Sequence, residues 1–329
     1  MNLRVVDHST PVATSARNPG FPLDLDWVDQ VRMNRSALER RAQTIGARRT
    51  VKKDWQAAWL LKAITLMDLT TLNSDDTAGR VERLCAKARH PVRADILEGL
   101  GVADLKLQPA AVCVYHSFVG TAVAALEGTD IPVAAVSTGF PHGLAPLDSK
   151  LKEIELSVAA GAREIDIVIE RHMVLTGDWR ALYEQVKAFR KACGEAHLKT
   201  ILGTGDLATL NNVAKASVVC MLAGADFIKT STGKEKVNAT LPVSLAMIRM
   251  IRWFGEQTGI EIGYKPAGGI SSAKTALDYM ALMKEELGIH WLQPHLFRFG
   301  ASSLLTDIER QLEHNLSGHY AADYRQPMV

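Results

Sequence analysis

Short runs of aliphatic and β-branched residues alternate with longer amphipathic stretches along the chain from about residue 54 onward. Eight of these runs have the length and composition of buried parallel strands. The predicted strands are Ile64–Thr70, Ala110–Tyr115, Pro132–Thr138, Glu164–Ile169, His197–Leu202, Phe227–Ser231, Glu261–Gly268 and Phe297–Ser302. The stretches between them repeat apolar residues at helical spacing. Asp148 and Asp178 are candidate N-caps for two of these helices.

The alternation of strands and helices predicts an α/β protein with a parallel sheet and right-handed crossovers. Eight is also the number of strands that closes a (β/α)8 TIM barrel. An open doubly wound sheet is the alternative, but no predicted strand is followed by a G-x-G-x-x-G turn. We therefore expect a barrel domain over residues 54–329 that includes a C-terminal tail. Four glycines lie where helices are expected to end: Gly128, Gly161, Gly194 and Gly224.

The first 53 residues have a different pattern and are predicted to form an N-terminal helical extension. Residues 1–22 are polar and contain three prolines, which is typical of a loosely held tail. From Asp26 to Ile45 the apolar residues recur at intervals of three, four and seven, which predicts a helix capped by Asp26. Basic residues are concentrated between Arg32 and Lys53 without interleaved aromatic residues. This pattern favours a solvated helix face over a nucleic-acid-binding surface.

Composition is that of a soluble globular chain, with 47% hydrophobic and 22% charged residues in 329. A net charge of +2 gives no indication of a nucleic-acid or acidic membrane partner. There is no apolar run long enough for a membrane span and no signal-peptide pattern, so we expect a cytoplasmic protein. The cysteines form no C-x-x-C pair and the histidines show no zinc-site spacing, so reduced thiols and no metal are expected.

Charged residues stand inside predicted strands that should be almost entirely apolar. They are Asp68, Asp166, Lys199, Lys229 and Lys265. Lysine and aspartate are rarely fully buried unless they are paired. A buried ion pair, or a lysine that reaches solvent from a strand end, could explain any one of them. Several together favour a catalytic site, because barrel enzymes carry their catalytic groups at the carboxyl ends of the strands.

Two strand lysines and a strand carboxylate can support imine chemistry. A free lysine amine has a pKa of about 10.4 and is protonated at neutral pH. Burial and a second cation both lower this pKa. A value near 7 requires about 4 to 5 kcal/mol of destabilisation of the charged form. A carboxylate within reach can then move protons during imine formation and carbon–carbon cleavage.

Turns rich in glycine or serine follow the last three predicted strands. They contain Gly233 and Lys234, then Gly268 and Gly269, then Ser302 and Ser303. Backbone N–H groups of glycine turns at a helix N-terminus bind phosphate, and barrels often carry such a site after strands 7 and 8. The sequence therefore predicts a phosphorylated small-molecule substrate.

At these residues the chain is similar to deoxyribose-phosphate aldolases, in particular to the longer members with an N-terminal extension. The segments that carry the resemblance are residues 66–73, 113–115, 164–166, 227–234, 265–269 and 298–303. The resemblance implies class I chemistry: reversible cleavage of 2-deoxy-D-ribose 5-phosphate to D-glyceraldehyde 3-phosphate and acetaldehyde, in deoxyribose catabolism, without a cofactor. It also implies a homo-oligomer, with a dimer favoured.

The resemblance assigns a role to each matching residue. Lys229 corresponds to the Schiff-base lysine, Lys265 to the lysine that perturbs it, and Asp166 to the aspartate of the proton relay. The phosphate-binding positions are Gly233, Lys234, Gly268, Gly269, Ser302 and Ser303. Supporting positions around the substrate are Asp68, Thr70, Lys199 and Cys113, although a small packed core residue is the favoured interpretation of Cys113.

Two departures from the family pattern are visible. Ser271 and Ser272 stand where the family often has an arginine after the paired glycines. Shorter members end in a tyrosine that reaches the active site, whereas this chain has Tyr320 and Tyr324 upstream of its end.

Three alternative functions remain: a zinc-dependent aldolase, a barrel that only binds a sugar phosphate, and nucleic-acid binding by the basic segment.

Overall fold

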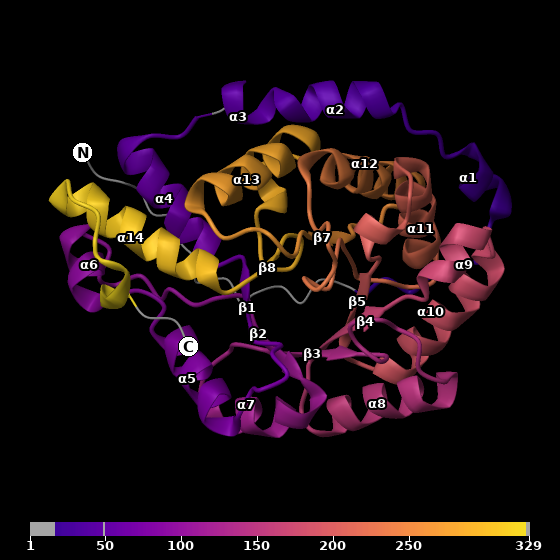
Figure 1. Cartoon of the computed structure of the whole chain (residues 1–329), viewed down its shortest axis with the longest axis horizontal. Helices are drawn as coiled ribbons and strands as arrows, with labels where there is room; N and C mark the ends of the chain where they lie inside the picture. Colours follow the sequence, from indigo (N-terminus) through magenta and orange to yellow (C-terminus); the bar gives the residue numbers. More distant parts are fainter. Residues whose placement is uncertain (1–16, 49, 327–329) are drawn as a thin grey trace.

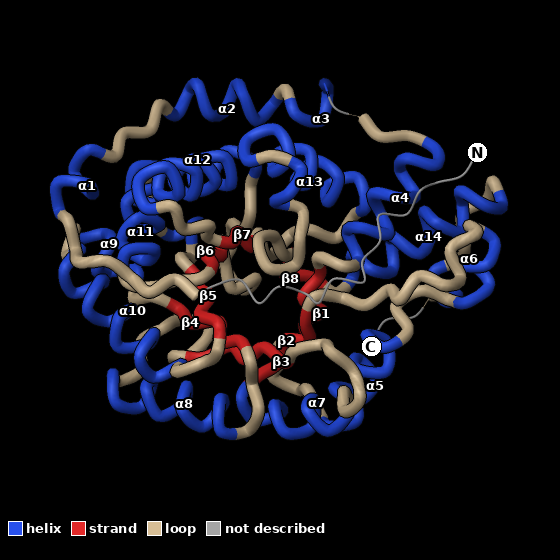
Figure 2. Tube along the Cα trace, turned by 180° about the vertical axis from the view of Figure 1, so that it is seen from behind, coloured by secondary structure: helices blue, strands red, loops and turns tan. Residues whose placement is uncertain are grey.

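The computed structural model describes residues 17–48 and 50–326. Its strands form one eight-stranded parallel sheet in the order β7-β6-β5-β4-β3-β2-β1-β8. They are β1 (Met67–Thr70), β2 (Ala111–Tyr115), β3 (Val133–Ser137), β4 (Glu164–Val168), β5 (His197–Ile201), β6 (Phe227–Lys229), β7 (Gly263–Lys265) and β8 (Phe299–Ala301). Figure 2 shows these strands as a ring surrounded by helices.

Hydrogen bonds between the outer strands close the ring. The N–H of Tyr264 in β7 donates to the carbonyl of Leu296 at 2.9 Å, and the N–H of Arg298 donates back to the carbonyl of Tyr264 at 3.0 Å. A bridge between Ala267 and Gly300 continues this contact. The prediction of a closed barrel is confirmed, and the open sheet is excluded.

Every predicted strand contains an observed one. The largest errors are three residues: the first strand begins at Met67 because Ile64 still belongs to the preceding helix α4, and the seventh ends at Lys265 rather than Gly268.

Helices pack around the barrel (Figure 1). The N-terminal ones are α1 (Leu25–Gln30), α2 (Arg35–Gln43), α3 (Ile45–Arg48) and α4 (Lys53–Ile64). The others are α5 (Ala78–Arg89), α6 (Ala94–Gly99), α7 (Val119–Ala125), α8 (Leu147–Ala159), α9 (Arg171–Thr176), α10 (Trp179–Cys193), α11 (Leu210–Leu222), α12 (Leu241–Thr258), α13 (Ala273–Leu287) and α14 (Ser303–Ser317). Short 3-10 turns occur at η1 (His116–Phe118), η2 (Thr204–Asp206), η3 (Ile289–Trp291) and η4 (Asp323–Arg325).

Most of the residues predicted to begin or end helices lie at or near helix ends. Asp178 caps α10 by accepting a hydrogen bond from the N–H of Ala181 at 3.0 Å. Asp148 was expected to cap α8, but it lies within the first turn, where its charge still favours the helix N-terminus. The glycines expected at helix ends all have positive φ: Gly128, Gly161, Gly194 and Gly224.

The predicted helix from Asp26 to Ile45 is divided among α1, α2 and the start of α3. Asp24, rather than Asp26, caps α1 by accepting from the N–H of Trp27 at 3.1 Å. The chain then leaves the helix after Gln30, and the N–H of Met33 donates to Asn211 at 2.7 Å instead of to a helical carbonyl. This contact with α11 accounts for the break, which no local pattern indicates.

The extension forms an outer layer against α11, α12 and α13 (Figures 1 and 2). Trp27 packs edge-on against Trp253 of α12, with ring centroids 5.2 Å apart. Residues 17–22 were expected to belong to a loose tail, but Asn18 is buried and bonds to the carbonyls of Met221 and Ala225. The rest of the predicted tail, residues 1–16, lies outside the described residues.

Candidate active site

The charged side chains predicted from the strands meet inside the barrel. Asp68 lies on β1, Asp166 on β4, Lys199 on β5, Lys229 on β6 and Lys265 on β7, and each is at most 3% exposed. Side chains alternate between the two faces of a strand, so flanking residues such as Ile165 and Ile167 join the hydrophobic core. The barrel thus converts a charge in an apolar run into an interior polar site.

Asp166 contacts three lysines. Its Oδ2 lies 2.8 Å from Nζ of Lys229 and 2.8 Å from Nζ of Lys265, and its Oδ1 lies 3.0 Å from Nζ of Lys199. The strand register explains this arrangement, because Lys229 is paired with Lys265 and Asp166 with Lys199. Asp68 completes the group through its Oδ2, which binds Nζ of Lys265.

Two further charged residues join this group, and the sequence pattern assigned neither of them a role. Glu164 binds Lys199 through one oxygen and Arg298 through the other. Arg298 also contacts Oδ1 of Asp68. The position of Glu164 in the group could have been predicted from the alternation of side chains along a strand. Glu164 stands two residues before Asp166 and therefore lies on the same strand face. Arg298 precedes β8, and its partners lie on distant strands.

The environment shifts the pKa of each of these groups. Burial would raise the pKa of Asp166, but Lys199, Lys229 and Lys265 outweigh it and hold the pKa well below its usual range. Burial would lower the pKa of Lys265, but the adjacent carboxylates Asp166 and Asp68 raise it. The pKa of Lys229 is shifted in the opposite direction, to a lower value.

Burial lowers the pKa of Lys229, and Lys265 lowers it further against the opposing effect of Asp166. Lys265 and Lys199 each contact two carboxylates or more, whereas Lys229 contacts one. Among the described lysines of this group, Lys229 is therefore the one most easily deprotonated.

Cys113 and Thr70 lie beside this group. Cys113 is fully buried in a small apolar cluster with Leu72, Ala134 and Val136, and burial raises the pKa of its thiol. An un-ionised thiol in such a cluster is typical of a packed core residue. Thr70 is half-buried, and its hydroxyl donates to the carbonyl of Asp68 at 2.7 Å.

The predicted phosphate-binding turns lie beyond the ends of β6, β7 and β8. Gly233 and Gly268 are adjacent, since a Cβ on Gly233 would lie 4.0 Å from Cα of Gly268. Lys234 and Ser303 are exposed. Ser302 occupies the N-cap position of α14 and makes no capping hydrogen bond, so its hydroxyl is available to a ligand.

Glu235 organises the first of these turns and was not singled out in the sequence. Its carboxylate accepts hydrogen bonds from the N–H groups of Thr232 and Gly233, the latter at 3.2 Å, and from Arg171 at 2.8 Å. In this structure, the amides of Thr232 and Gly233 therefore bind the Glu235 carboxylate. Only the short T-x-x-E spacing could have indicated this.

The structure places the residues at which this chain departs from the family pattern, namely the serines after the paired glycines and the tyrosines near the C-terminus. Ser272 caps α13 by accepting from the N–H of Thr275 at 3.2 Å, while Ser271 is exposed. Tyr320 is 61% exposed and stacks on His314, and Tyr324 is 84% exposed. Neither tyrosine is buried within the barrel in this structure.

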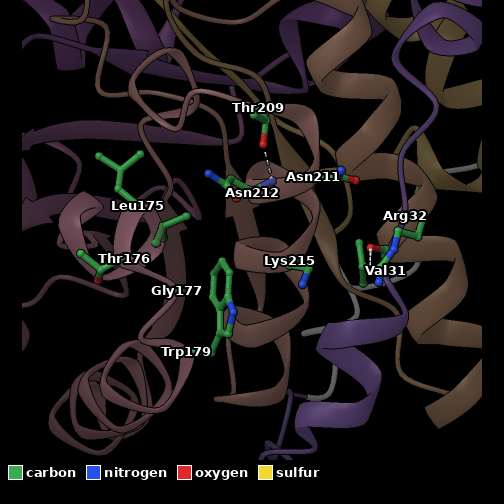
Figure 3. Close-up of a pocket in the computed structure, with 11 residues that line it drawn as sticks. Val31, Arg32, Leu175, Thr176, Gly177, Trp179, Thr209, Asn211, Asn212 and Lys215 are labelled. Atoms are coloured by element: carbon green, nitrogen blue, oxygen red, sulfur yellow. Dashed lines mark hydrogen bonds between the residues drawn. The ribbon is translucent and has the colours of Figure 1, made fainter.

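A separate surface pocket of about 520 Å³ lies between the N-terminal extension and α9, α10 and α11 (Figure 3). Arg32, Trp179 and Lys215 are among its lining residues, and none of the predicted site residues contributes to it. Within residues 17–48 and 50–326, there is no cluster of three or more His, Cys, Asp or Glu residues that could hold a metal ion. None of the described helices is long and apolar enough to cross a membrane.

An eight-stranded α/β barrel with converging charged side chains is the architecture of a large class of enzymes. The family model described as DeoC/LacD family aldolase matches residues 62–306. The chain belongs to this family and is an aldolase, a carbon–carbon lyase.

Relatives support this assignment over nearly the whole chain. The chain is 58% identical over 316 residues to the human deoxyribose-phosphate aldolase, covering 95% of this chain and 99% of that protein. It is 60% identical over 311 residues to the mouse deoxyribose-phosphate aldolase, covering 94% and 98%. The deoxyribose phosphate aldolase structure from Aeropyrum pernix has the same fold, with a TM-score of 0.58 and 22% identity over 85% of this chain and 99% of that one.

Proposed function

We propose that this aldolase reversibly cleaves 2-deoxy-D-ribose 5-phosphate to D-glyceraldehyde 3-phosphate and acetaldehyde, through a Schiff base on Lys229. The main support is the position of the Lys229 amine, which is buried 2.8 Å from a carboxylate oxygen that it shares with Lys265. Burial and Lys265 lower the pKa of this amine, which increases its uncharged, nucleophilic fraction.

The first half of the reaction forms the imine. The Lys229 amine adds to the aldehyde carbon of the open-chain sugar, and the resulting carbinolamine loses water to give an iminium ion. Addition moves one proton from the amine nitrogen to the aldehyde oxygen. Loss of water then takes up a second proton, which is released when the final imine is hydrolysed. Asp166, within hydrogen-bond reach of the amine, can relay these protons directly or through one water.

The second half breaks the carbon–carbon bond. Loss of the proton from the C3 hydroxyl drives cleavage of the C2–C3 bond, and the electron pair enters the iminium group. D-Glyceraldehyde 3-phosphate leaves, and an enamine remains on Lys229. Protonation of the enamine carbon and hydrolysis of the imine release acetaldehyde. The iminium nitrogen accepts the electrons, so the proposal requires neither a metal nor an organic cofactor.

The turns after the last strands would hold the phosphate. Gly268 and Gly269 would supply backbone N–H groups, Gly233 would supply its N–H by exchanging Glu235 for the phosphate, and Lys234 would supply a positive charge. Ser302 and Ser303 would add contacts at the N-terminus of α14. Asp68, Thr70, Lys199 and Cys113 would support the catalytic groups from the surrounding strands.

Trapping of the imine tests the reaction and its residue together. Wild type and Lys229→Met would be incubated with acetaldehyde and borohydride, and the intact masses compared. We expect a two-carbon adduct on wild type alone. No adduct on wild type, under conditions that trap a known imine-forming aldolase, would overturn the proposal. Full activity in a strong chelator is also expected, because no step uses a metal.

The cellular setting is also part of the proposal. The four cysteines are free and buried, which fits a reducing cytoplasm and a role in deoxyribose catabolism. A homodimer is expected for the solution state, although the Aeropyrum pernix relative is described as tetrameric. Light scattering on the purified protein would determine the oligomeric state.

A further inference from the structure

Six buried side chains in the barrel form a closed ring of alternating charge. The contacts run from Arg298 to Asp68, Lys265, Asp166, Lys199 and Glu164, and then back to Arg298. Every member is at most 6% exposed. Since all six charges are shielded from water, the balance of charge within the ring matters far more than it would at the surface.

In its shortest contacts within the ring, each carboxylate divides its two oxygens between two cations. Longer contacts join Nη1 of Arg298 to Oε2 of Glu164 at 3.3 Å and Nζ of Lys199 to Oδ2 of Asp68 at 3.6 Å. Asp68 binds Arg298 through Oδ1 and Lys265 through Oδ2. Glu164 accepts from Nη2 of Arg298 at 2.8 Å through Oε1 and binds Lys199 through Oε2. Asp166 binds Lys199 and Lys265 in the same way. Three cations and three carboxylates therefore neutralise one another.

Lys229 is attached to this ring as a seventh charged group. Its amine contacts Oδ2 of Asp166, which Lys265 already occupies at the same distance of 2.8 Å. A proton on Lys229 would therefore leave one positive charge without a counter-ion in a buried site. Such an unbalanced charge is costly, because little solvent is present to stabilise it.

We propose that Arg298 and Glu164 are positioning residues that close the ring, so that its neutrality leaves Lys229 without a counter-ion of its own and its amine reacts uncharged. The inference rests on the proposed role of Lys229. It extends that role to two residues that touch neither Lys229 nor the substrate-binding turns in this structure.

The groups that face Lys229 are consistent with this role. They are Asp166 from β4, Lys265 from β7 and Cys113 from β2, with Lys199 from β5 on the far oxygen of Asp166. Burial lowers the pKa of Lys229 and Lys265 lowers it further, while Asp166 and Cys113 oppose them. Arg298 and Glu164 act at longer range, by fixing the net charge of the ring.

Two substitutions of opposite charge test the proposal. Arg298→Met gives the ring a charge of −1, which balances a protonated Lys229. Glu164→Gln gives the ring a charge of +1, which opposes protonation. The readout is the rate of acetaldehyde labelling of Lys229 with cyanoborohydride, followed by mass spectrometry between pH 5 and 9. The acid limb of this profile reports the pKa of the Lys229 amine.

We expect the acid limb to move to higher pH by about one unit or more in Arg298→Met, and to lower pH by a similar amount in Glu164→Gln. The double variant restores neutrality, and its limb should return to near that of wild type. Glu309→Gln is the matched control, because Glu309 is a buried carboxylate paired with Lys87 on the helices outside the ring. Its limb should not move.

If Arg298 and Glu164 had a purely structural role, both single variants would label Lys229 more slowly, but their acid limbs would not move in opposite directions. That result would overturn the proposal. If circular dichroism shows that Arg298→Met does not fold, the nearly isosteric Glu164→Gln alone tests the proposal. An acid limb of Glu164→Gln that stays at the wild-type pH or moves to higher pH would then overturn the proposed role of the ring. Failure of the proposed function is distinguishable, since wild type itself would then take up no label.

Discussion

Lys229 and Lys265 are paired in register on the adjacent strands β6 and β7, and both amines lie 2.8 Å from the same oxygen of Asp166. The register places two amines beside one carboxylate in a buried site. Because Lys265 also has Asp68 as a partner, it retains its proton more strongly than Lys229 does. The pair is therefore unequal, with one amine held as a cation and the other as the nucleophile.

Loss of the Lys265 charge should raise the pKa of Lys229, because the positive charge of Lys265 helps to lower it. In Lys265→Met, Lys229 would no longer face a neighbouring cation, so its pKa should rise and the uncharged fraction should fall. We expect kcat/KM at pH 7 to fall by roughly 10- to 100-fold, because the rate follows the fraction of uncharged Lys229. The measurement is kcat/KM between pH 6 and 9, where the deficit should shrink as pH rises. A deficit that is constant across this range would contradict the explanation.

Replacement of Asp166 by asparagine should affect both catalysis and stability. The amide cannot carry the proton, so kcat should fall by roughly 10²- to 10⁴-fold. Three buried lysines would also lose a counter-ion, which should cost about 3–5 kcal/mol in the free energy of unfolding. Urea unfolding measures this cost.

Asp178→Asn is the matched control for this change. Asp178 caps α10 at the surface, and asparagine caps a helix equally well. Its free energy of unfolding should stay within about 0.5 kcal/mol of wild type. Equal losses in the two variants would show that the buried contacts of Asp166 contribute nothing.

Acid should destabilise the protein through the ring carboxylates. The pKa values of Asp68, Glu164 and Asp166 all lie below those of an unfolded chain. Their stabilising contribution is therefore complete above the unfolded values of about 3.9 to 4.3, and it is lost as pH falls below them toward the lower folded values.

The free energy of unfolding, measured with urea from pH 7 to pH 3, should fall steeply below about pH 4. Glu164→Gln should flatten this decline, because it removes one of the linked protons. Glu309 gives the control, since burial raises the pKa of this carboxyl group, and Glu309→Gln should leave the decline at low pH in place.

The barrel and the five charged strand residues were predictable because both follow from local pattern. A charge within an apolar run must face inward in a closed barrel, and eight strands alternating with helices leave few other folds. The contacts of Arg298 were not predictable in this way. They depend on which side chains face one another across the barrel, and Asp68 is 230 positions away in the chain.

The errors at the N-terminus have the same origin. The break between α1 and α2 and the order of residues 17–22 are produced by contacts with α11 and with the residues just before β6. In the first phosphate-binding turn, the sequence indicated Gly233 and Lys234 but not Glu235. The role of Glu235 becomes visible only when its carboxylate is seen on the amides of the turn.

Lys234 should contribute to recognition of the phosphate group and little else. Lys234→Ala is expected to raise the KM for 2-deoxy-D-ribose 5-phosphate about 3- to 10-fold, with kcat nearly unchanged, because an exposed lysine gives a modest, screened attraction. Activity on unphosphorylated 2-deoxy-D-ribose should not change. Lys236, an exposed lysine two positions later, is the control. An equal effect of Lys236→Ala would indicate a general charge effect.

Asn18 should tie the N-terminal extension to the strand that carries Lys229. Its side-chain amide donates to the carbonyls of Met221 and Ala225 at 2.7 and 2.9 Å. Its backbone N–H donates to Asp226, the residue before β6, at 2.8 Å. Asn18→Ala leaves two buried carbonyls without these donors, so the free energy of unfolding should fall by about 1–3 kcal/mol.

The site itself should remain intact in Asn18→Ala, because none of the site residues contacts Asn18 in the described structure. kcat/KM at 25 °C should therefore stay within about twofold of wild type, while thermal unfolding begins at a lower temperature. Asn315→Ala, at an exposed position on α14, is the control and should be neutral or slightly stabilising. If Asn18→Ala is as stable as this control, the extension is held by its apolar contacts with α12 rather than by Asn18.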